Sequence, residues 1–326
     1  MRFLARRCAA ALIVALAFGA VATAASAMTL YTSEVLPDVQ ALIDEFQKDH
    51  PGTEVKVFRT GSGEIVAKLR AELEAHNPQA DAVWIADPSF LEYLTGLGEL
   101  RRIDIRAAGY PAAYSYQKGA YHEVRLIQNI IAVNTQQLGT APRPTDWTDL
   151  IKPEYRNLVA MPDPNYSGGA LATLGALAKR YGFDFFVKLK ANGMRIERSN
   201  PLLLQKLAQG EYGIALMVDF NVRQEIGNGA PLQIVYPKGG TVLIPTPIGV
   251  VAQAKDAATA EAFVRFLLTR PAQTIFADRG YAPVAAGVSL PGAAAARALP
   301  LSAPSLSLAD KADLLRRFNE LFGLSE

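Results

Sequence analysis

Short apolar strands alternate with amphipathic helices along most of this sequence, and that alternation limits the fold more than any other feature. In the first half, apolar or alternating runs at residues 29–31, 54–58 and 82–86 predict strands. The intervening segments 39–46, 63–73 and 88–97 carry apolar residues at helical spacing. Such alternation predicts an α/β protein with mostly parallel sheet and helices on both faces.

The second half of the sequence repeats this pattern. Strands are predicted at 126–133, 158–161, 194–196, 213–218, 234–236 and 243–252, and helices at 170–181, 185–192, 202–209, 259–268 and 309–322. About 300 residues exceed what one hydrophobic core usually holds, so two lobes are expected. Runs 126–134 and 244–252 are candidates to cross between them. The predicted division is 28–128 plus 250–326 for lobe one and 129–249 for lobe two. A cleft between two such lobes is a common ligand site.

The N-terminus has the three parts of a secretory signal peptide. Arg2, Arg6 and Arg7 precede an apolar run over 8–20, and 25–27 reads Ala-Ser-Ala. The run is shorter than the ~20 residues of a transmembrane helix. We therefore expect residues 1–27 to be removed and the mature protein to be periplasmic; a short membrane anchor is the alternative. The single cysteine, Cys8, lies in this leader, so the mature chain has no disulfide or thiolate site.

The charge balance argues against nucleic acid as a partner. The chain has 33 Lys and Arg against 31 Asp and Glu, and three of the arginines lie in the leader, which leaves 30 basic residues against 31 acidic ones. The mature sequence also lacks a basic run interleaved with aromatics. An anion site in this protein must therefore be local.

Three loops bring hydroxyl groups and glycines to the N-termini of predicted helices. A helix N-terminus carries partial positive charge and free N–H groups, and glycine lets a ligand approach the backbone. Such loops can hold an anion, although Ser and Thr are also ordinary N-caps. All three follow strands, so they are expected to meet at one site. The candidates are Thr32 and Ser33; Thr60, Gly61 and Ser62; and Tyr166, Ser167, Gly168 and Gly169.

Two aspartates, Asp87 and Asp219, end predicted strands, where α/β proteins place ligand contacts. Each could receive an ammonium or hydroxyl group, and helix capping is the alternative, especially for Asp87 before Pro88. Catalysis has little support. The three histidines are scattered, and the sequence contains no nucleophile elbow, zinc-protease motif or P-loop. A secreted hydrolase remains the alternative of a different class.

Several segments, in this order, resemble the extracellular solute-binding proteins of ABC importers, in their ferric-iron-binding-like branch. The segments are 30–34, 60–69, 80–84, 163–170, 204–211 and 261–268. The resemblance implies a two-lobed type II periplasmic-binding-protein fold, with two crossing strands as hinge and a cleft that closes on its ligand. It also implies an ABC permease as partner, no enzymatic activity, and a monomer without cofactor.

The sequence departs from the iron-binding members of that family. No histidine follows Tyr31, and Phe220-Asn221 stands where those members have adjacent tyrosines. The anion-holding segment with Ser167 is kept, and Asn200 matches a further anion contact of the family. The resemblance therefore implies a small anionic solute, a phosphonate such as an aminoalkylphosphonate or a phosphorylated metabolite, and no metal. Asp87 and Asp219 are expected to contact its ammonium or hydroxyl end, with Asn221 nearby. A ferric iron–anion complex is the alternative ligand.

Overall fold

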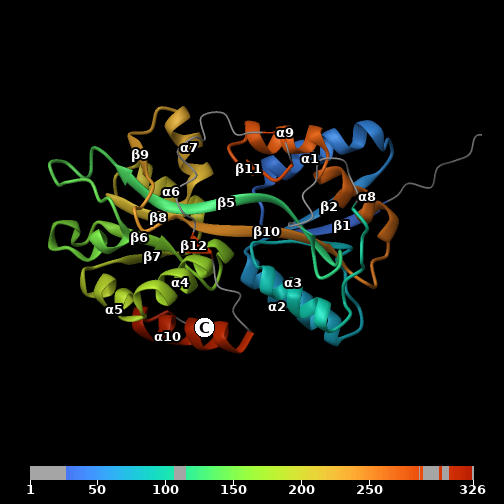
Figure 1. Ribbon diagram of the computed structural model, residues 1–326, viewed down its shortest axis with the longest axis horizontal. Helices are drawn as coiled ribbons and strands as arrows, with labels where there is room; N and C mark the ends of the chain where they lie inside the picture. Colours follow the sequence, from blue (N-terminus) through green and yellow to red (C-terminus); the bar gives the residue numbers. More distant parts are fainter. Residues whose placement is uncertain (1–26, 106–114, 286, 289–300, 303–307, 325–326) are drawn as a thin grey trace, which may run out of the picture.

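Two groups of parallel strands, each covered by helices, lie side by side in the computed structural model (Figure 1). The structure describes residues 27–105, 115–285, 287–288, 301–302 and 308–324. The predicted signal peptide, apart from Ala27, lies outside these residues. None of the described helices is long and apolar enough to cross a membrane.

The described strands form one twelve-stranded mixed sheet, whose main path is β2-β1-β3-β10-β5-β8-β6-β7. Its strands are β1 (Ala27–Thr32), β2 (Glu54–Arg59), β3 (Ala82–Trp84), β4 (Ser115–Tyr116), β5 (Tyr121–Asn134), β6 (Val159–Pro162), β7 (Arg195–Glu197), β8 (Ile214–Val218), β9 (Leu232–Val235), β10 (Val242–Val250), β11 (Ala282–Pro283) and β12 (Leu301–Ser302).

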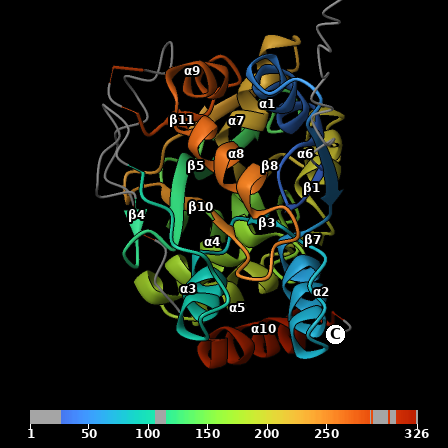
Figure 2. The same cartoon turned by 90° about the vertical axis from the view of Figure 1, so that its right-hand side faces the viewer.

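Helices cover both faces of each half of the sheet (Figures 1 and 2). They are α1 (Leu36–Asp49), α2 (Ser62–Glu74), α3 (Pro88–Gly96), α4 (Gly168–Tyr181), α5 (Asp184–Ala191), α6 (Asn200–Ala208), α7 (Asp219–Gly227), α8 (Ala257–Leu267), α9 (Arg270–Asp278) and α10 (Leu308–Phe322), with 3₁₀ turns η2 (Trp147–Ile151) and η3 (Pro153–Tyr155).

Side chains of β1 alternate between two cores, as a strand between two helical layers requires. Leu30 packs in the same cluster as Phe46 of α1, whereas Tyr31 packs with Ile65 of α2. The predicted alternation of strands and helices therefore has its physical cause in a sheet buried on both faces.

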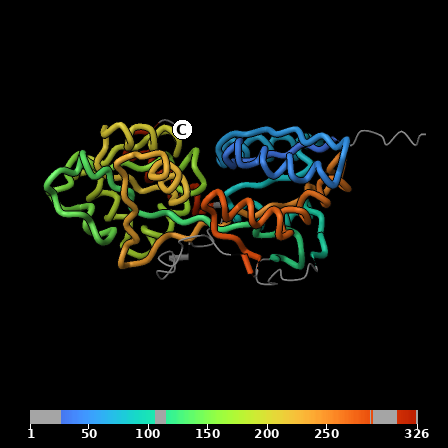
Figure 3. The backbone as a smooth tube through the Cα atoms, turned by 90° about the horizontal axis from the view of Figure 1, so that it is seen from above, coloured from blue at the N-terminus to red at the C-terminus, as the bar shows by residue number. Residues whose placement is uncertain are grey.

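Two long strands, β5 and β10, join the halves. They pair antiparallel from Asn129↔Val242 to Tyr121↔Gly249, with an irregularity between Pro245 and Pro247. β10 also pairs with β3 in the first half, and β5 with β8 in the second. Figure 1 shows both strands running across the molecule from one half to the other. Figure 3 shows the two halves side by side from above. These are the two crossing strands that the sequence predicts, although β5 begins five residues earlier than expected.

The C-terminal helix α10 contacts both halves. Phe318 meets Phe186 of α5 edge-on, with ring centroids 5.8 Å apart. Lys311, two turns before Phe318 in α10, forms an ion pair with Asp87 just before α3. Figure 2 shows α10 along the bottom of the molecule. The predicted division places this segment in lobe one, whereas its aromatic contacts are with α5 of the other half.

Candidate ligand-binding cleft

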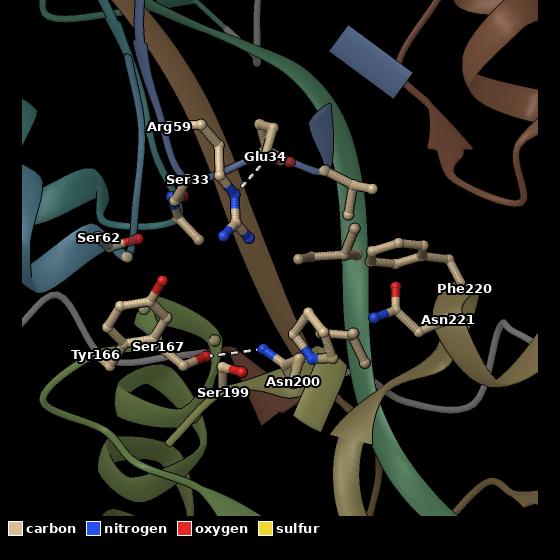
Figure 4. Close-up of a pocket in the computed structure, with 18 of the residues that line it drawn as sticks. Ser33, Glu34, Arg59, Ser62, Tyr166, Ser167, Ser199, Asn200, Phe220 and Asn221 are labelled. Atoms are coloured by element: carbon tan, nitrogen blue, oxygen red, sulfur yellow. Dashed lines mark hydrogen bonds between the residues drawn. The ribbon is translucent and has the colours of Figure 1, made fainter. Parts of the chain in front are cut away.

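A cavity opens between the two halves, where strands end and helices begin (Figure 4). Its empty volume is about 610 Å³, which includes the open solvent at its mouth. The lining residues come from both halves and from β5. They are 33–35, 59, 61, 62, 86, 125, 127, 166–169, 199–201, 218, 220 and 221.

Several helices point their N-termini at this cavity. The lining includes the first residues of α2, α4 and α6, residues 220 and 221 in the first turn of α7, and residues 33–35 just before α1. Each N-terminus offers backbone N–H groups without helical partners and carries about half a positive charge. Their convergence makes the cavity suited to an anion.

Ser167 shows how capping and ligand binding can coexist. Its Oγ accepts from the backbone N–H of Ala170 (3.2 Å), which caps α4, and from Nδ2 of Asn200 (3.0 Å). With two bonds accepted, the hydroxyl proton remains to be donated into the cavity, because a hydroxyl has one donor and two acceptor positions. Ser167 can therefore act both as a helix N-cap and as a ligand contact, the two roles that the sequence suggests for it.

Glycines allow the two halves to touch beside the cavity. A Cβ on Gly61 would lie 2.4 Å from the carbonyl oxygen of Tyr166, and one on Gly168 would lie 2.3 Å from that of Ala86. The ion pair between Arg198 and Glu64 (3.0 Å) links the same two halves. The halves are thus in backbone contact across the cleft.

Two arginines supply positive charge. Arg59, the last residue of β2, donates from Nε to the backbone oxygen of Glu34 (3.1 Å), and Figure 4 shows its terminal nitrogens directed into the cavity. Arg125 on β5 is 1% exposed, forms an ion pair with the Glu34 carboxylate and lies 3.6 Å above the Tyr281 ring. Burial lowers the pKa of Arg125, but a guanidinium stays charged at physiological pH.

Neither arginine was among the site residues predicted from sequence. Arg59 follows a strand and directly precedes Thr60-Gly61, so the strand-end rule applied to that loop could have found it. Arg125 is a charge inside a strand that is buried over most of its length, which is itself a signal of a specific partner.

The cavity brings together most of the predicted site residues. Those in its lining are Ser33, Gly61, Ser62, Tyr166, Ser167, Gly168, Gly169, Asn200 and Asn221. Thr32 and Thr60 lie outside it. The buried Thr32 Oγ1 accepts from the N–H of Glu34 (3.1 Å), and the Thr60 hydroxyl bonds to the Glu64 carboxylate.

The two predicted aspartates also lie outside the lining. Asp87 caps α3, accepting from Phe90 N (3.2 Å), and pairs with Lys311 in a second cavity. Asp219 is 3% exposed and pairs with Arg223, and burial raises the pKa of its carboxyl. Both carboxylates are engaged by protein cations, so the expected contact with the ligand's ammonium or hydroxyl end has no geometric support.

The described residues contain no group of three or more His, Cys, Asp or Glu side chains placed to hold a metal ion. Within the lining, Tyr166 is the one tyrosine and Glu34 the one carboxylate, and Glu34 is paired with Arg125. This donor set fits an anion better than a hard metal cation.

The chain is similar in sequence and fold to bacterial transport receptors. A family model described as bacterial extracellular solute-binding protein matches residues 29–282. The putative 2-aminoethylphosphonate-binding periplasmic protein of Salmonella paratyphi A is 28% identical over 269 residues, covering 77% of this chain and 76% of that protein.

Solved structures share the whole fold. The substrate-binding protein of an ABC transporter from Agrobacterium tumefaciens has a TM-score of 0.82 and 19% identity, covering 93% of this chain and 96% of that chain. AfuA from Actinobacillus pleuropneumoniae, solved with fructose-6-phosphate, has a TM-score of 0.78 and 21% identity, covering 93% and 100%. The predicted periplasmic-binding-protein fold is thereby confirmed. The chain belongs to the bacterial extracellular solute-binding proteins, which bind small solutes for ABC permeases, and it is a transport receptor and not an enzyme.

Proposed function

We propose that this receptor acts in the periplasm as a monomer, where it captures a small solute bearing a phosphonate or phosphate group and delivers it to an ABC permease. The observation that carries the proposal is the convergence of several helix N-termini and Arg59 on one cavity whose single carboxylate is already paired. Charge-assisted hydrogen bonds from such donors are stronger than neutral ones, and a phosphoryl group accepts several of them.

The phosphoryl group is expected between Arg59 and the start of α4. There it meets Ser62 from one half, and the Ser167 hydroxyl and the N–H groups of Gly168 and Gly169 from the other. The similar proteins fit this chemistry, because 2-aminoethylphosphonate and fructose-6-phosphate both carry such a group. An anion held by both halves binds best when the halves are together, so binding favours closure.

The ferric alternative is weaker on geometry. A ferric cage needs several anionic oxygen ligands, and the lining offers one phenol, Tyr166, and the Glu34 carboxylate. Recruiting Glu34 would leave the buried Arg125 without its counter-charge, which is strongly unfavourable.

Calorimetry on the purified receptor, freed of co-purified solute, tests the proposal. We expect saturable binding of fructose-6-phosphate, 2-aminoethylphosphonate or inorganic phosphate, and none of fructose or spermidine. Stoichiometric uptake of ferric iron with a tyrosinate absorption band, or no response to any phosphoryl compound, would refute it. Mass spectrometry of the solute released on denaturation gives an independent identification.

A further inference from the structure

We infer that the cleft selects phosphoryl solutes whose other end is a neutral hydroxyl group and disfavours those that end in an ammonium group. This inference rests on the proposed function and narrows its ligand class. It follows from the ion pairs that the carboxylates in and near the cleft already form with cations of the protein.

The one carboxylate in the lining and the two aspartates predicted for the site are each paired with a cation of the protein. Glu34 pairs with Arg125, Asp87 with Lys311, and Asp219 with Arg223. None is therefore free to neutralise a ligand ammonium group. A zwitterionic solute would have to bury its cation without a counter-charge, which costs far more than burying a hydroxyl.

Glu34 is the one carboxylate that lines the cavity, and its partner holds it in place. Arg125 is 1% exposed and packed against the Tyr281 ring at 3.6 Å. If Glu34 turned to a ligand ammonium, that guanidinium would remain buried and uncompensated. Replacing the Glu34–Arg125 ion pair by an ion pair between Glu34 and the ligand therefore gives no net gain in binding free energy.

The remaining charge of the cavity is positive and repels a second cation. Arg59 directs its guanidinium inward, and the N-terminus of α7 adds partial positive charge beside Asn221. An ammonium group a few ångströms from a phosphoryl group would feel both. A hydroxyl would feel neither strongly.

Asn221 supplies what a hydroxyl needs. It is 6% exposed and lines the cavity, and its Oδ1 has no hydrogen-bond partner among the described residues. Figure 4 shows its amide across the cavity from Ser62, whose buried Oγ likewise has no partner in the described part of the chain. In either orientation the amide offers one acceptor and one donor, which match a hydroxyl group. The two unpartnered groups thus lie at opposite ends of one bound solute.

A matched pair of ligands provides the test. 2-Hydroxyethylphosphonate and 2-aminoethylphosphonate differ only in the hydroxyl or ammonium at the end of the same chain. Calorimetry should show the hydroxyl compound binding at least about tenfold more tightly, and ethylphosphonate, which lacks both groups, binding more weakly than the hydroxyl compound. Equal or tighter binding of the amino compound overturns the inference and leaves the proposed function standing. If no phosphoryl compound binds, both fail.

A substitution that adds a negative charge tests whether Asn221 contacts the end of the solute opposite the phosphoryl group. Asn221→Asp adds a carboxylate of the same shape, and an acid in the first turn of α7 suits the helix. It should shift the ratio of the two affinities at least tenfold toward the amino compound. Gln224→Glu makes the same charge change on an exposed position of the same helix and should leave the ratio unchanged. An unaltered ratio in Asn221→Asp, or an equal shift in both variants, would overturn the assignment of Asn221.

Discussion

The substitution Gly168→Ala should prevent the cleft from closing fully without disrupting the fold. Gly168 begins α4 in one half, and an added Cβ would lie 2.3 Å from the Ala86 carbonyl oxygen and 2.8 Å from Ser62 Oγ in the other half. Ordinary contact starts at 3.4 Å, so the halves must separate by about 1.1 Å. Alanine is otherwise compatible with a helix and is better there than glycine by up to ~1 kcal/mol.

The expected loss of affinity follows from this separation. Hydrogen bonds of ~2.9 Å that span the ligand would stretch to about 4.0 Å, beyond bonding range. Two lost bonds to a charged ligand, at ~1.5–3 kcal/mol each, amount to about 3–6 kcal/mol. The dissociation constant should therefore rise by about two to four orders of magnitude.

Calorimetry with the tightest phosphoryl ligand measures the effect, and thermal unfolding without ligand checks the fold. Gly96→Ala in α3, where a Cβ meets nothing within 4 Å, is the matched control. Gly63→Ala, whose Cβ would lie 1.9 Å from Asn165 O, should repeat the result. Wild-type affinity in Gly168→Ala would refute the reasoning, and a large drop in melting temperature would show damage to the fold instead.

Three further outcomes are expected. Arg59→Ala should weaken phosphoryl binding at least tenfold and reduce its salt dependence, because it removes a charge directed into the cavity; a salt titration by calorimetry checks this. Ser167→Ala should weaken binding by about 1–3 kcal/mol, whereas Thr60→Ala, whose hydroxyl faces Glu64, should have a smaller effect in the same assay. Burial lowers the pKa of His122 from 6.5 to about 4. Between these two pH values the unfolded chain binds more protons than the folded protein. The free energy of unfolding therefore falls by about 3 kcal/mol as the pH drops from 6.5 to 4. Urea unfolding at both ends of it should show His122→Gln losing less stability than wild type.

The fold was largely readable from sequence because its signals are local. Periods of two and 3.6 marked β1 to β3 and the helices between them, since each element buries its own faces. β5 was read too short because His122, Glu123 and Arg125 interrupt the apolar pattern. Distant partners satisfy two of these, as Thr246 N donates to Glu123 and Glu34 pairs with Arg125. A single sequence gives no access to such contacts.

The sequence predicted those lining residues whose position follows from backbone geometry. Ser62, Ser167 and Gly168 were found because a glycine or hydroxyl at a helix start has the same geometry wherever it occurs. Charged side chains follow no such rule. Asp87 and Asp219 stand at strand ends as predicted, yet Lys311, which is 224 residues away in sequence, and Arg223 engage them.

Charge and hydrogen bonding are divided unequally across the cleft. Arg59 and Arg125 belong to the strands of the first half and the crossing region, whereas Ser167, Asn200 and Asn221 on the other side are neutral. Arg59, which has no carboxylate partner among the described residues, adds a full charge to the partial charges of the helix N-termini, and it attracts an anion over about a Debye length, ~8 Å at physiological salt, before the halves meet. The neutral side adds short-range hydrogen bonds, which form only after contact and are lost when the cleft opens. Charge should therefore govern mainly how fast the solute is captured, and the backbone contact around Gly168 how long it is held.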